Sequence, residues 1–329
     1  SQYNIEVMEI TIPYYEDNTR ISNSAIGWFI KNGPAFLHKK LSGLIPDEKG
    51  PQLERGTMIH EYILQPAEFY KDYIVFDGLR PKSDQQQKFC EALIKSVEIE
   101  PDKAVLDAYK KSYSIVGKSE EKMLSEGLKL ASDLKDYIDV LKDGRTIISE
   151  YDQQKCQDVR NSIYEHKFAG KILDEVGWEE YHEFHINWEC AGVPCKSLLD
   201  CVKFDPINKK CQLIDLKTTV KLWHFEDSIE QYDYLRQLKF YEMAIWWYLA
   251  NERNENPEDW TFEYYIIAID STQSSDVRVF KFEQYAVDSR FVVIHSAIEN
   301  IRWHNENNKW EHTRAYYEGD GCEVLLSFI

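Results

Sequence analysis

Residues 193–219 read VPCKSLLDCVKFDPINKKCQLIDLKTT, and this stretch decides the fold expected of the chain. Its two ends are apolar runs that predict strands over Val193–Phe204 and Cys211–Thr219. The six residues between them, DPINKK, are typical of a turn, because Asp, Pro and Asn each favour turn conformations. The stretch is therefore predicted to form an antiparallel hairpin.

Two acids, Asp200 and Asp215, stand opposite each other if the turn centres between Ile207 and Asn208. Side chains opposed in this way lie roughly 4.5–5.5 Å apart at Cβ. Two carboxylates at that separation repel each other, so either one is protonated or a cation lies between them. Mg²⁺, a hard cation that prefers oxygen ligands, suits such a pair, with Mn²⁺ as the alternative.

Lys217 follows Asp215 by two residues, so the two side chains share one face of the strand. Its ammonium would lie beside the metal and an attacked phosphate, where it would stabilise developing negative charge. The carbonyl of Leu216 could serve as a further ligand. The hairpin therefore predicts metal-dependent phosphodiester hydrolysis by Asp200, Asp215 and Lys217. Taken alone the pattern is weak, because an acid and a lysine on one strand face are more often a solvated pair.

Gln237 and Tyr241 add context, since residues four apart share a helix face. Either they form part of a buried apolar stripe, or they face the carboxylates and contact phosphate or the nucleophile. His60 is a second candidate upstream, in the run RGTMIH that begins at Arg55, where Gly56 permits close backbone approach. A lone histidine on an apolar helix is usually structural; in a nuclease it would bind metal or phosphate.

The net charge of −18 disfavours overall attraction to DNA. Positive potential is therefore expected in one confined groove. Three residues are predicted to bind DNA there: Arg55, Arg236 and Lys239. Other candidate sources of charge are Lys39, Lys40, Lys217 and Lys221.

Seven cysteines are present, an odd number without a CxxC pair. Four of them cluster between residues 190 and 211, but their spacing fits no zinc or iron–sulfur ligand pattern. Reduced, mostly buried thiols are expected. No apolar run approaches the roughly 18 residues of a membrane span, and the first residues lack the features of a signal peptide. A cytoplasmic protein without membrane contact is expected.

Helical patterns dominate to about residue 175, and strands and helices then alternate. Further strands are predicted over Tyr181–Trp188, Thr261–Ile269 and Val277–Phe282, with helices over 225–250 and 285–305. This order predicts an α/β fold whose mixed sheet is flanked by helices. The whole chain, 1–329, is expected to be one domain with a helical insertion at roughly 90–150.

Four stretches together resemble the nuclease domain of RecE-type exonuclease VIII, a branch of the PD-(D/E)XK superfamily. They are RISNSAIGWFIKNGPAFLHKKLSG (20–43), RGTMIHEYILQPAEFY (55–70), EFHINWECAGVPCKSLLDCVKFDPINKKCQLIDLKTT (183–219) and YDYLRQLKFYEMA (232–244). The third is the most specific, because strand, turn and the run DLKTT occur in the family's order. The resemblance implies a PD-(D/E)XK nuclease-like core with the following site residues: His60, Asp200 and Asp215 on metal, Lys217 catalytic, Gln237 and Tyr241 in support, and Glu183 as a further acid.

The resemblance also implies an activity and partners. These are 5′-to-3′ digestion of linear double-stranded DNA from its ends, leaving 3′ single-stranded tails, a ring-shaped homo-oligomer, and a RecT-like single-strand annealing protein. A phage or prophage origin and a bacterial cytoplasmic location follow. The alternatives are a single-strand or structure-specific nuclease of the same superfamily, and a catalytically inactive DNA-binding module. The intact Asp200, Asp215 and Lys217 argue against the inactive module.

Overall fold

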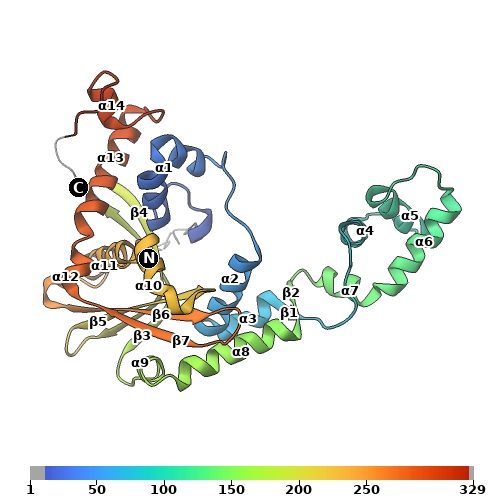
Figure 1. Cartoon of the computed structure of the whole chain (residues 1–329), viewed down its shortest axis with the longest axis horizontal. Coiled ribbons are helices and arrows are strands. Elements are labelled where there is room, and N and C mark those ends of the chain that lie inside the picture. The colour runs from blue at the N-terminus through green and yellow to red at the C-terminus, as the bar shows by residue number, and fades with distance from the viewer. Residues whose placement is uncertain (1–11, 326–329) are drawn as a thin grey trace, which may run out of the picture. The chain divides into compact units, whose positions relative to one another are not determined.

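The structure is a computed structural model that describes residues 12–325. The chain divides into two compact units (Figure 1). One comprises the chain up to His60 together with the residues from Val159 onward, and the other is Glu61–Asp158. Both candidate carboxylates and His60 lie in the first, the sheet unit.

A five-stranded mixed sheet forms the centre of the sheet unit, in the order β3-β4-β5-β6-β7. All neighbours are antiparallel except β5 and β6, which are parallel and are joined by a helical crossover. The strands are β3 (Glu179–Cys190), β4 (Val193–Asp205), β5 (Lys210–Thr219), β6 (Thr261–Asp270) and β7 (Val277–Phe282). The predicted α/β class, the mixed sheet and all five strands are confirmed, with ends that differ by a few residues at most.

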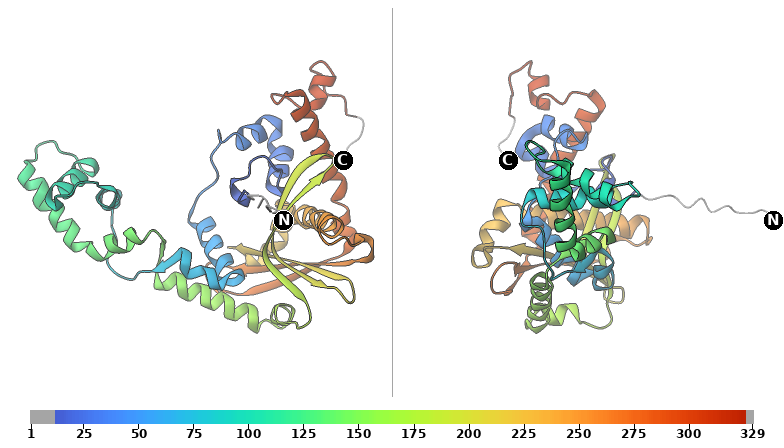
Figure 2. Two further views of the ribbon diagram at one scale, coloured as in Figure 1. Left: turned by 180° about the vertical axis from the view of Figure 1, so that it is seen from behind. Right: turned by 90° about the vertical axis from the view of Figure 1, so that its right-hand side faces the viewer.

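Helices lie on both faces of this sheet (Figures 1 and 2). The α-helices of the unit are α1 (Asn23–Leu41), α2 (Pro51–Leu64), α8 (Glu150–Glu165), α9 (Ala169–Leu173), α10 (Phe225–Gln231), α11 (Tyr234–Asn251), α12 (Gln284–Asp288), α13 (Phe291–Asn307) and α14 (Arg314–Glu318), of which α2 and α8 continue into the other unit. Short 3-10 helices are η1 (Tyr14–Glu16), η2 (Leu222–His224) and η3 (Pro257–Asp259). Within residues 12–325, no helix combines the length and the apolar character needed to cross a bilayer.

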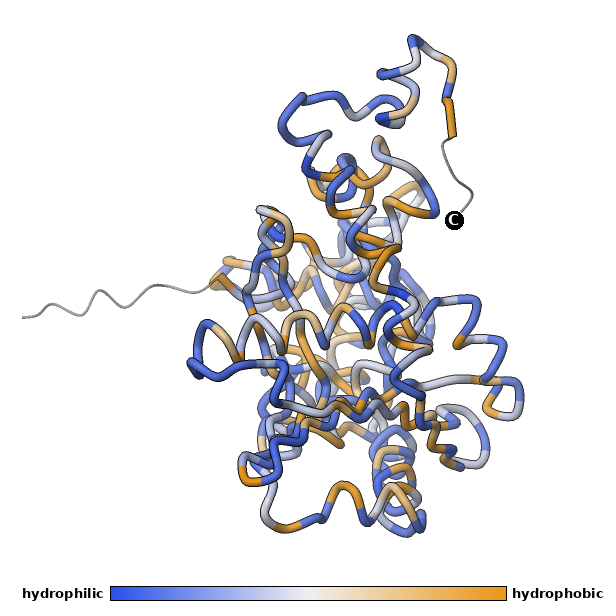
Figure 3. The backbone as a smooth tube through the Cα atoms, turned by 90° about the vertical axis from the view of Figure 1, so that its left-hand side faces the viewer, coloured by the Kyte–Doolittle hydropathy of each residue, from blue (hydrophilic) through white to orange (hydrophobic). Residues whose placement is uncertain are grey.

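The main core lies between the sheet and helices α1, α11 and α13. Phe240 of α11 packs on Trp188 of β3, with ring centroids 4.9 Å apart. Figure 3 shows hydrophobic stretches of the backbone gathered in the interior and hydrophilic ones in the outer loops. The opposite face of the sheet is covered near α9, where buried Lys203 of β4 donates a hydrogen bond to the carbonyl of Ile172.

The other unit is mostly helical and has its own core, which includes Phe89, Tyr109 and Tyr137. Its elements are α3 (Pro66–Asp72), β1 (Tyr73–Val75), α4 (Asp84–Lys95), α5 (Pro101–Ser112), α6 (Glu120–Asp133), α7 (Lys135–Asp143) and β2 (Thr146–Ile148). The expected helical insertion at roughly 90–150 falls mainly in this unit. The parallel pair β1–β2 was not predicted. Whether 1–329 is a single domain stays a prediction.

The helix predicted over 225–250 is broken in two at Asp233. This residue has a left-handed backbone (φ 50°), and its carboxylate caps α11 by accepting the N–H of Arg236 at 3.2 Å. Such a cap satisfies one of the free N–H groups at a helix start. The break turns the chain into α11, which carries Gln237 and Tyr241.

Helix α2 approaches β5 closely at Gly56. A Cβ at this position would lie 2.9 Å from Oγ1 of Thr218, a distance that real Cβ atoms do not tolerate. The closeness matters because His60, one turn further along α2, then reaches the backbone of β5. Glycine at position 56 therefore sets the distance between this helix and the strand that carries Asp215.

A double-mutant cycle on Gly56 and Thr218 tests whether α2 and β5 lie this close together. Alanine in a helix interior is ordinarily favoured over glycine by about 1 kcal/mol, whereas crowding a packed contact costs about 1–3 kcal/mol. We expect Gly56→Ala to lower the free energy of unfolding in the native background. In a Thr218→Ala background, where the crowded oxygen is gone, the same change should raise it. Chemical denaturation of the four proteins measures both effects, and an equal effect in the two backgrounds would contradict the close approach.

Candidate active site

The β4–β5 hairpin has the register predicted from its turn. The paired residues run from Asp205 opposite Lys210 to Cys201 opposite Ile214. One step further, where the ladder ends, this register sets Asp200 against Asp215. There a side-chain hydrogen bond takes the place of the backbone hydrogen bonds between the strands, because Oδ2 of Asp200 accepts the backbone N–H of Leu216 at 2.8 Å. The two acids are thus held at the point where β4 leaves β5.

β3 bends at the same level. His182 pairs with Cys201 and Phe184 with Leu199, which leaves Glu183 and Asp200 outside the paired register. Glu183 has a left-handed backbone (φ 49°), a conformation that costs about 1–3 kcal/mol in a non-glycine residue and is found most often at functional sites. It breaks the strand's alternation and brings a third acid to the pair.

His60 links α2 to this group of acids. Its Nδ1 lies 2.8 Å from the carbonyl oxygen of Gly56, and its Nε2 lies 2.7 Å from that of Leu216 and 3.6 Å from Oδ2 of Asp200. Both ring nitrogens face carbonyl oxygens, and only a doubly protonated imidazole donates to both. Although burial lowers the pKa of His60, Asp200 and the two carbonyls raise it to about 9.

Asp215 and Lys217 share one face of β5, as predicted. Nζ of Lys217 lies 2.7 Å from Oδ2 of Asp215 and 4.7 Å from the centre of the Tyr234 ring. Burial lowers the pKa of Lys217, but Asp215 and Asp200 outweigh it, so the pKa lies above its usual value. The ammonium is therefore fixed between a carboxylate and an aromatic face.

The three carboxyl groups respond differently to this crowding. Burial raises the pKa of Asp215 to about 6, with Lys217 opposing the rise and Asp200 adding to it. Burial and then Asp200 raise the pKa of Glu183 to about 7. Burial also acts to raise the pKa of Asp200, but His60 and Lys217 hold it below its usual value. The group thus contains more buried negative charge than its two cations neutralise.

Gln237 and Tyr241 of α11 form one polar unit. Nε2 of Gln237 donates a hydrogen bond to the hydroxyl of Tyr241 at 3.0 Å. Burial raises the pKa of Tyr241 well above its usual value, and the nearby Asp215 adds to the rise. The Tyr241 hydroxyl accepts from Gln237, so its own proton is available to a substrate oxygen. Tyr234, whose ring faces Lys217, was not among the predicted site residues, although it lies three residues before Gln237 on the same face of α11.

The three residues predicted to bind DNA lie in different settings. Arg55 is half-buried on α2. Arg236 is 6% exposed and its Nε donates to Asn23 of α1 at 3.1 Å. Lys239 is held by two acids, Glu242 at 2.7 Å and Asp288 at 2.9 Å. The charges of Arg236 and Lys239 are thus largely engaged within the protein, which leaves Arg55 as the stronger candidate.

The donor set of this site fits a divalent cation. Oδ2 of Asp215 is buried and has no aligned hydrogen bond among the described residues, although Nζ of Lys217 lies close as an ion-pair partner. Asp200, Asp215, Glu183 and the Leu216 carbonyl offer only oxygen atoms, which suit Mg²⁺ or Mn²⁺. His60 could join them only after losing a proton and its contact with Leu216.

The charge state of His60 gives a prediction for the metal-free protein. Its pKa is about 9 in the folded chain against 6.5 for the free side chain. The stability it contributes is complete below pH 6.5 and is lost as the pH rises through 9, with a slope of about 1.4 kcal/mol per pH unit for one proton. With a chelator present, the free energy of unfolding should fall more steeply between pH 7 and 9.5 for the native protein than for His60→Gln. Parallel pH profiles would show that His60 is uncharged.

Comparisons with known proteins agree with this fold. A family model described as "PDDEXK-like domain of unknown function (DUF3799)" matches residues 22–315. The crystal structure of a "putative exonuclease" from Eubacterium rectale is similar in fold, with a TM-score of 0.51 and 13% identity over 98% of this chain and 96% of that chain. No match was found among the curated proteins. The narrower RecE-type resemblance stays a prediction. Since the family model spans most of its length, the chain belongs to this PDDEXK-like family, which confirms the predicted PD-(D/E)XK resemblance.

Proposed function

We propose that the chain is a metal-dependent DNA exonuclease that hydrolyses phosphodiester bonds at the ends of linear double-stranded DNA. One observation carries the proposal: three carboxyl groups from β3, β4 and β5, one buried and two partly buried, converge beside a fixed lysine, in a chain of the PDDEXK-like family. Such crowding is unfavourable without a cation and is what a metal-binding hydrolytic site requires.

Asp200, Asp215 and the carbonyl of Leu216 would hold Mg²⁺, with Glu183 nearby as a further acid and His60 as the remaining candidate ligand. Mn²⁺ is the alternative ion. When bound, such an ion activates water at neutral pH and offsets phosphate charge. In the metal-free chain, the imidazolium of His60 supplies part of that positive charge.

Lys217 would act on the phosphate. Its ammonium is held by Asp215 and by the Tyr234 ring, so it needs little reorganisation to face charge that develops on phosphate oxygens. Tyr241, oriented by Gln237, would donate its hydroxyl proton to a phosphate or water oxygen. Each of these residues would therefore bind or orient the reacting groups.

The finer features rest on the resemblance to the RecE-type nucleases. They are 5′-to-3′ polarity, 3′ single-stranded tails for recombination by strand annealing, a RecT-like annealing partner, a ring-shaped homo-oligomer and a phage or prophage origin. Arg55 is the proposed main contact with the DNA backbone. Arg236 and Lys239 would contribute less, because partners within the protein already hold their side chains.

A nuclease assay with three DNA forms tests the proposal. The protein is incubated with Mg²⁺ and end-labelled linear duplex, covalently closed circular duplex or linear single strands. We expect rapid loss of the linear duplex and survival of the closed circle, because an exonuclease needs an end. Asp215→Asn should lose activity by orders of magnitude while its metal-free stability at pH 8 rises, since a crowded buried charge is removed.

Asp259→Asn is the matched control, because it makes the same chemical change at an exposed aspartate of η3, before the start of β6. It should retain the native rate. Cleavage of the closed circle, or undiminished hydrolysis by Asp215→Asn, would refute the exonuclease proposal or its active site.

A further inference from the structure

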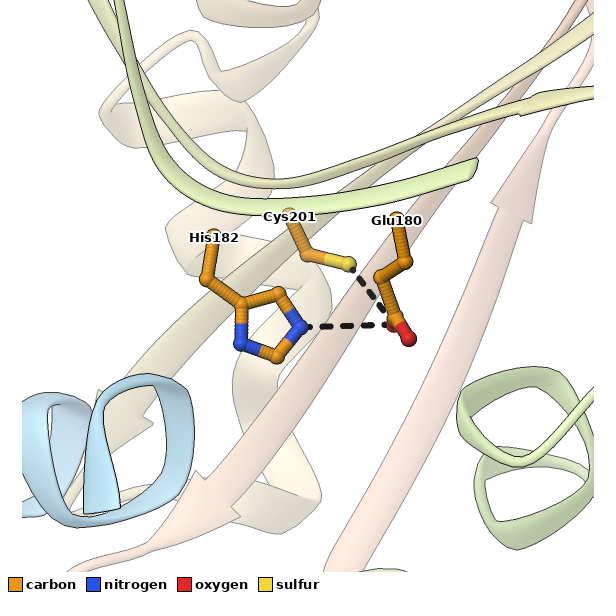
Figure 4. A group of neighbouring side chains, drawn as sticks. All are labelled: Glu180, His182 and Cys201. Atoms are coloured by element: carbon orange, nitrogen blue, oxygen red, sulfur yellow. Dashed lines mark hydrogen bonds and ion pairs between the residues drawn. The ribbon is translucent and has the colours of Figure 1, made fainter. Parts of the chain in front are cut away.

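A second group of metal-ligating side chains lies on the same two strands as the carboxylates. Glu180 and His182 of β3 converge with Cys201 of β4 (Figure 4). Nε2 of His182 lies 3.3 Å from Oε1 of Glu180, and Sγ of Cys201 lies 3.4 Å from the same oxygen. His182 and Cys201 are register partners, so the strand pairing itself sets their separation.

These separations are close to those of ligands around one tetrahedral zinc ion. With metal–ligand bonds of about 2.0–2.3 Å, oxygen and nitrogen ligands stand about 3.3 Å apart and oxygen and sulfur ligands about 3.5 Å apart. A charge-assisted hydrogen bond between imidazole and carboxylate is shorter, about 2.7–2.9 Å. The contact between His182 and Glu180, an ion pair longer than such a bond, therefore also fits shared coordination.

The ligand set is chemically different from that of the carboxylate site. It combines thiol, imidazole and carboxylate, a mixture that favours Zn²⁺ over Mg²⁺. It also lies on the other side of the strands, because Cys201 directly follows Asp200 on β4 and adjacent strand residues point to opposite faces. His182 is the register partner of Cys201 and therefore shares its face. The two groups are thus back to back across β3 and β4.

We propose that Glu180, His182 and Cys201 bind one zinc ion, separate from the nuclease centre, that fastens β3 to β4 behind Glu183 and Asp200. Three side-chain ligands leave the fourth position of a tetrahedral zinc ion to water. A bond forms between zinc and Sγ of Cys201, and the thiol proton leaves to solvent. The site depends on neither DNA nor nuclease activity.

Neighbouring charge does not oppose this site strongly. Buried Lys203, opposite Glu180 in the register, is directed to the carbonyl of Ile172 and lies 3.7 Å from Glu175. Burial and then Glu180 raise the pKa of the Cys201 thiol well above its usual value, and the charge of Lys203 acts against that rise. Reduced, mostly buried thiols were expected here, because the spacing of the cysteines between residues 190 and 211 fits no metal-ligand pattern.

Cobalt substitution tests the proposal on the full chain. Metal-free protein is titrated with Co²⁺, whose bond to a thiolate gives a charge-transfer absorption. We expect that absorption to saturate at one equivalent, to disappear when Zn²⁺ is added, and to survive excess Mg²⁺. Cys201→Ser should lose it, whereas Cys190→Ser, which removes a half-buried cysteine of β3 outside the cluster, should keep it.

Two further variants keep the test decisive. His182→Asn, at a partly exposed position, should weaken zinc binding by more than about tenfold, since even residues behind a ligand change metal affinity 10–100-fold. Asp215→Asn should leave the cobalt absorption unchanged, which separates this site from the carboxylate site. Absence of the absorption in the native protein, its persistence in Cys201→Ser, or unchanged zinc affinity in His182→Asn would overturn the proposal.

Discussion

Repulsion among three crowded carboxyl groups, one buried and two partly buried, is the constraint on which the rest of the site depends. Glu183, Asp200 and Asp215 come from three neighbouring strands, and the pKa values of Glu183 and Asp215 rise to about 7 and about 6. A protein gains no stability from gathering these groups. Their convergence is explained if the site exists to bind positive charge. In the metal-free chain that charge is the imidazolium of His60 and the ammonium of Lys217. In the active enzyme it would include a divalent ion.

The surrounding architecture holds these groups in place against their repulsion. The Leu216 N–H fixes Asp200, the left-handed backbone of Glu183 turns that acid inward, and Gly56 lets α2 bring His60 to the carbonyl of Leu216. The proposed zinc ion would act in the same way from the other face, by joining the strands where they bend. Each feature restrains the backbone close to one acid.

Local sequence was sufficient for the hairpin because its turn residues set the register and the register sets which acids are opposed. Pairing of Asp215 with Lys217 followed from strand alternation alone. Other features depend on contacts between distant segments. The sequence suggested Glu183 only as a further acid, since nothing local shows its left-handed backbone.

Contacts between distant segments also explain why the settings of the basic residues and of Cys201 were not predicted from the sequence. Lys239 was expected to bind DNA, yet its partner Asp288 lies far along the chain. Spacing rules also did not predict the proposed zinc ligands, because His182 and Cys201 are brought together by cross-strand register and not by sequence distance. The alternation of apolar and polar residues was therefore enough to predict the strands of the sheet. The partners of the charged side chains could be identified only from the folded structure.

If the acids of β3, β4 and β5 form a cation site, a divalent ion binds among them. The most direct test is a crystal structure of the protein grown with Mn²⁺, with the ion located by its anomalous scattering. We expect a peak within coordination distance of Asp200, Asp215 and the carbonyl oxygen of Leu216, with the His60 ring displaced from that carbonyl. A structure at saturating Mn²⁺ with no peak among these residues, and with His60 still bound to Leu216, would contradict it.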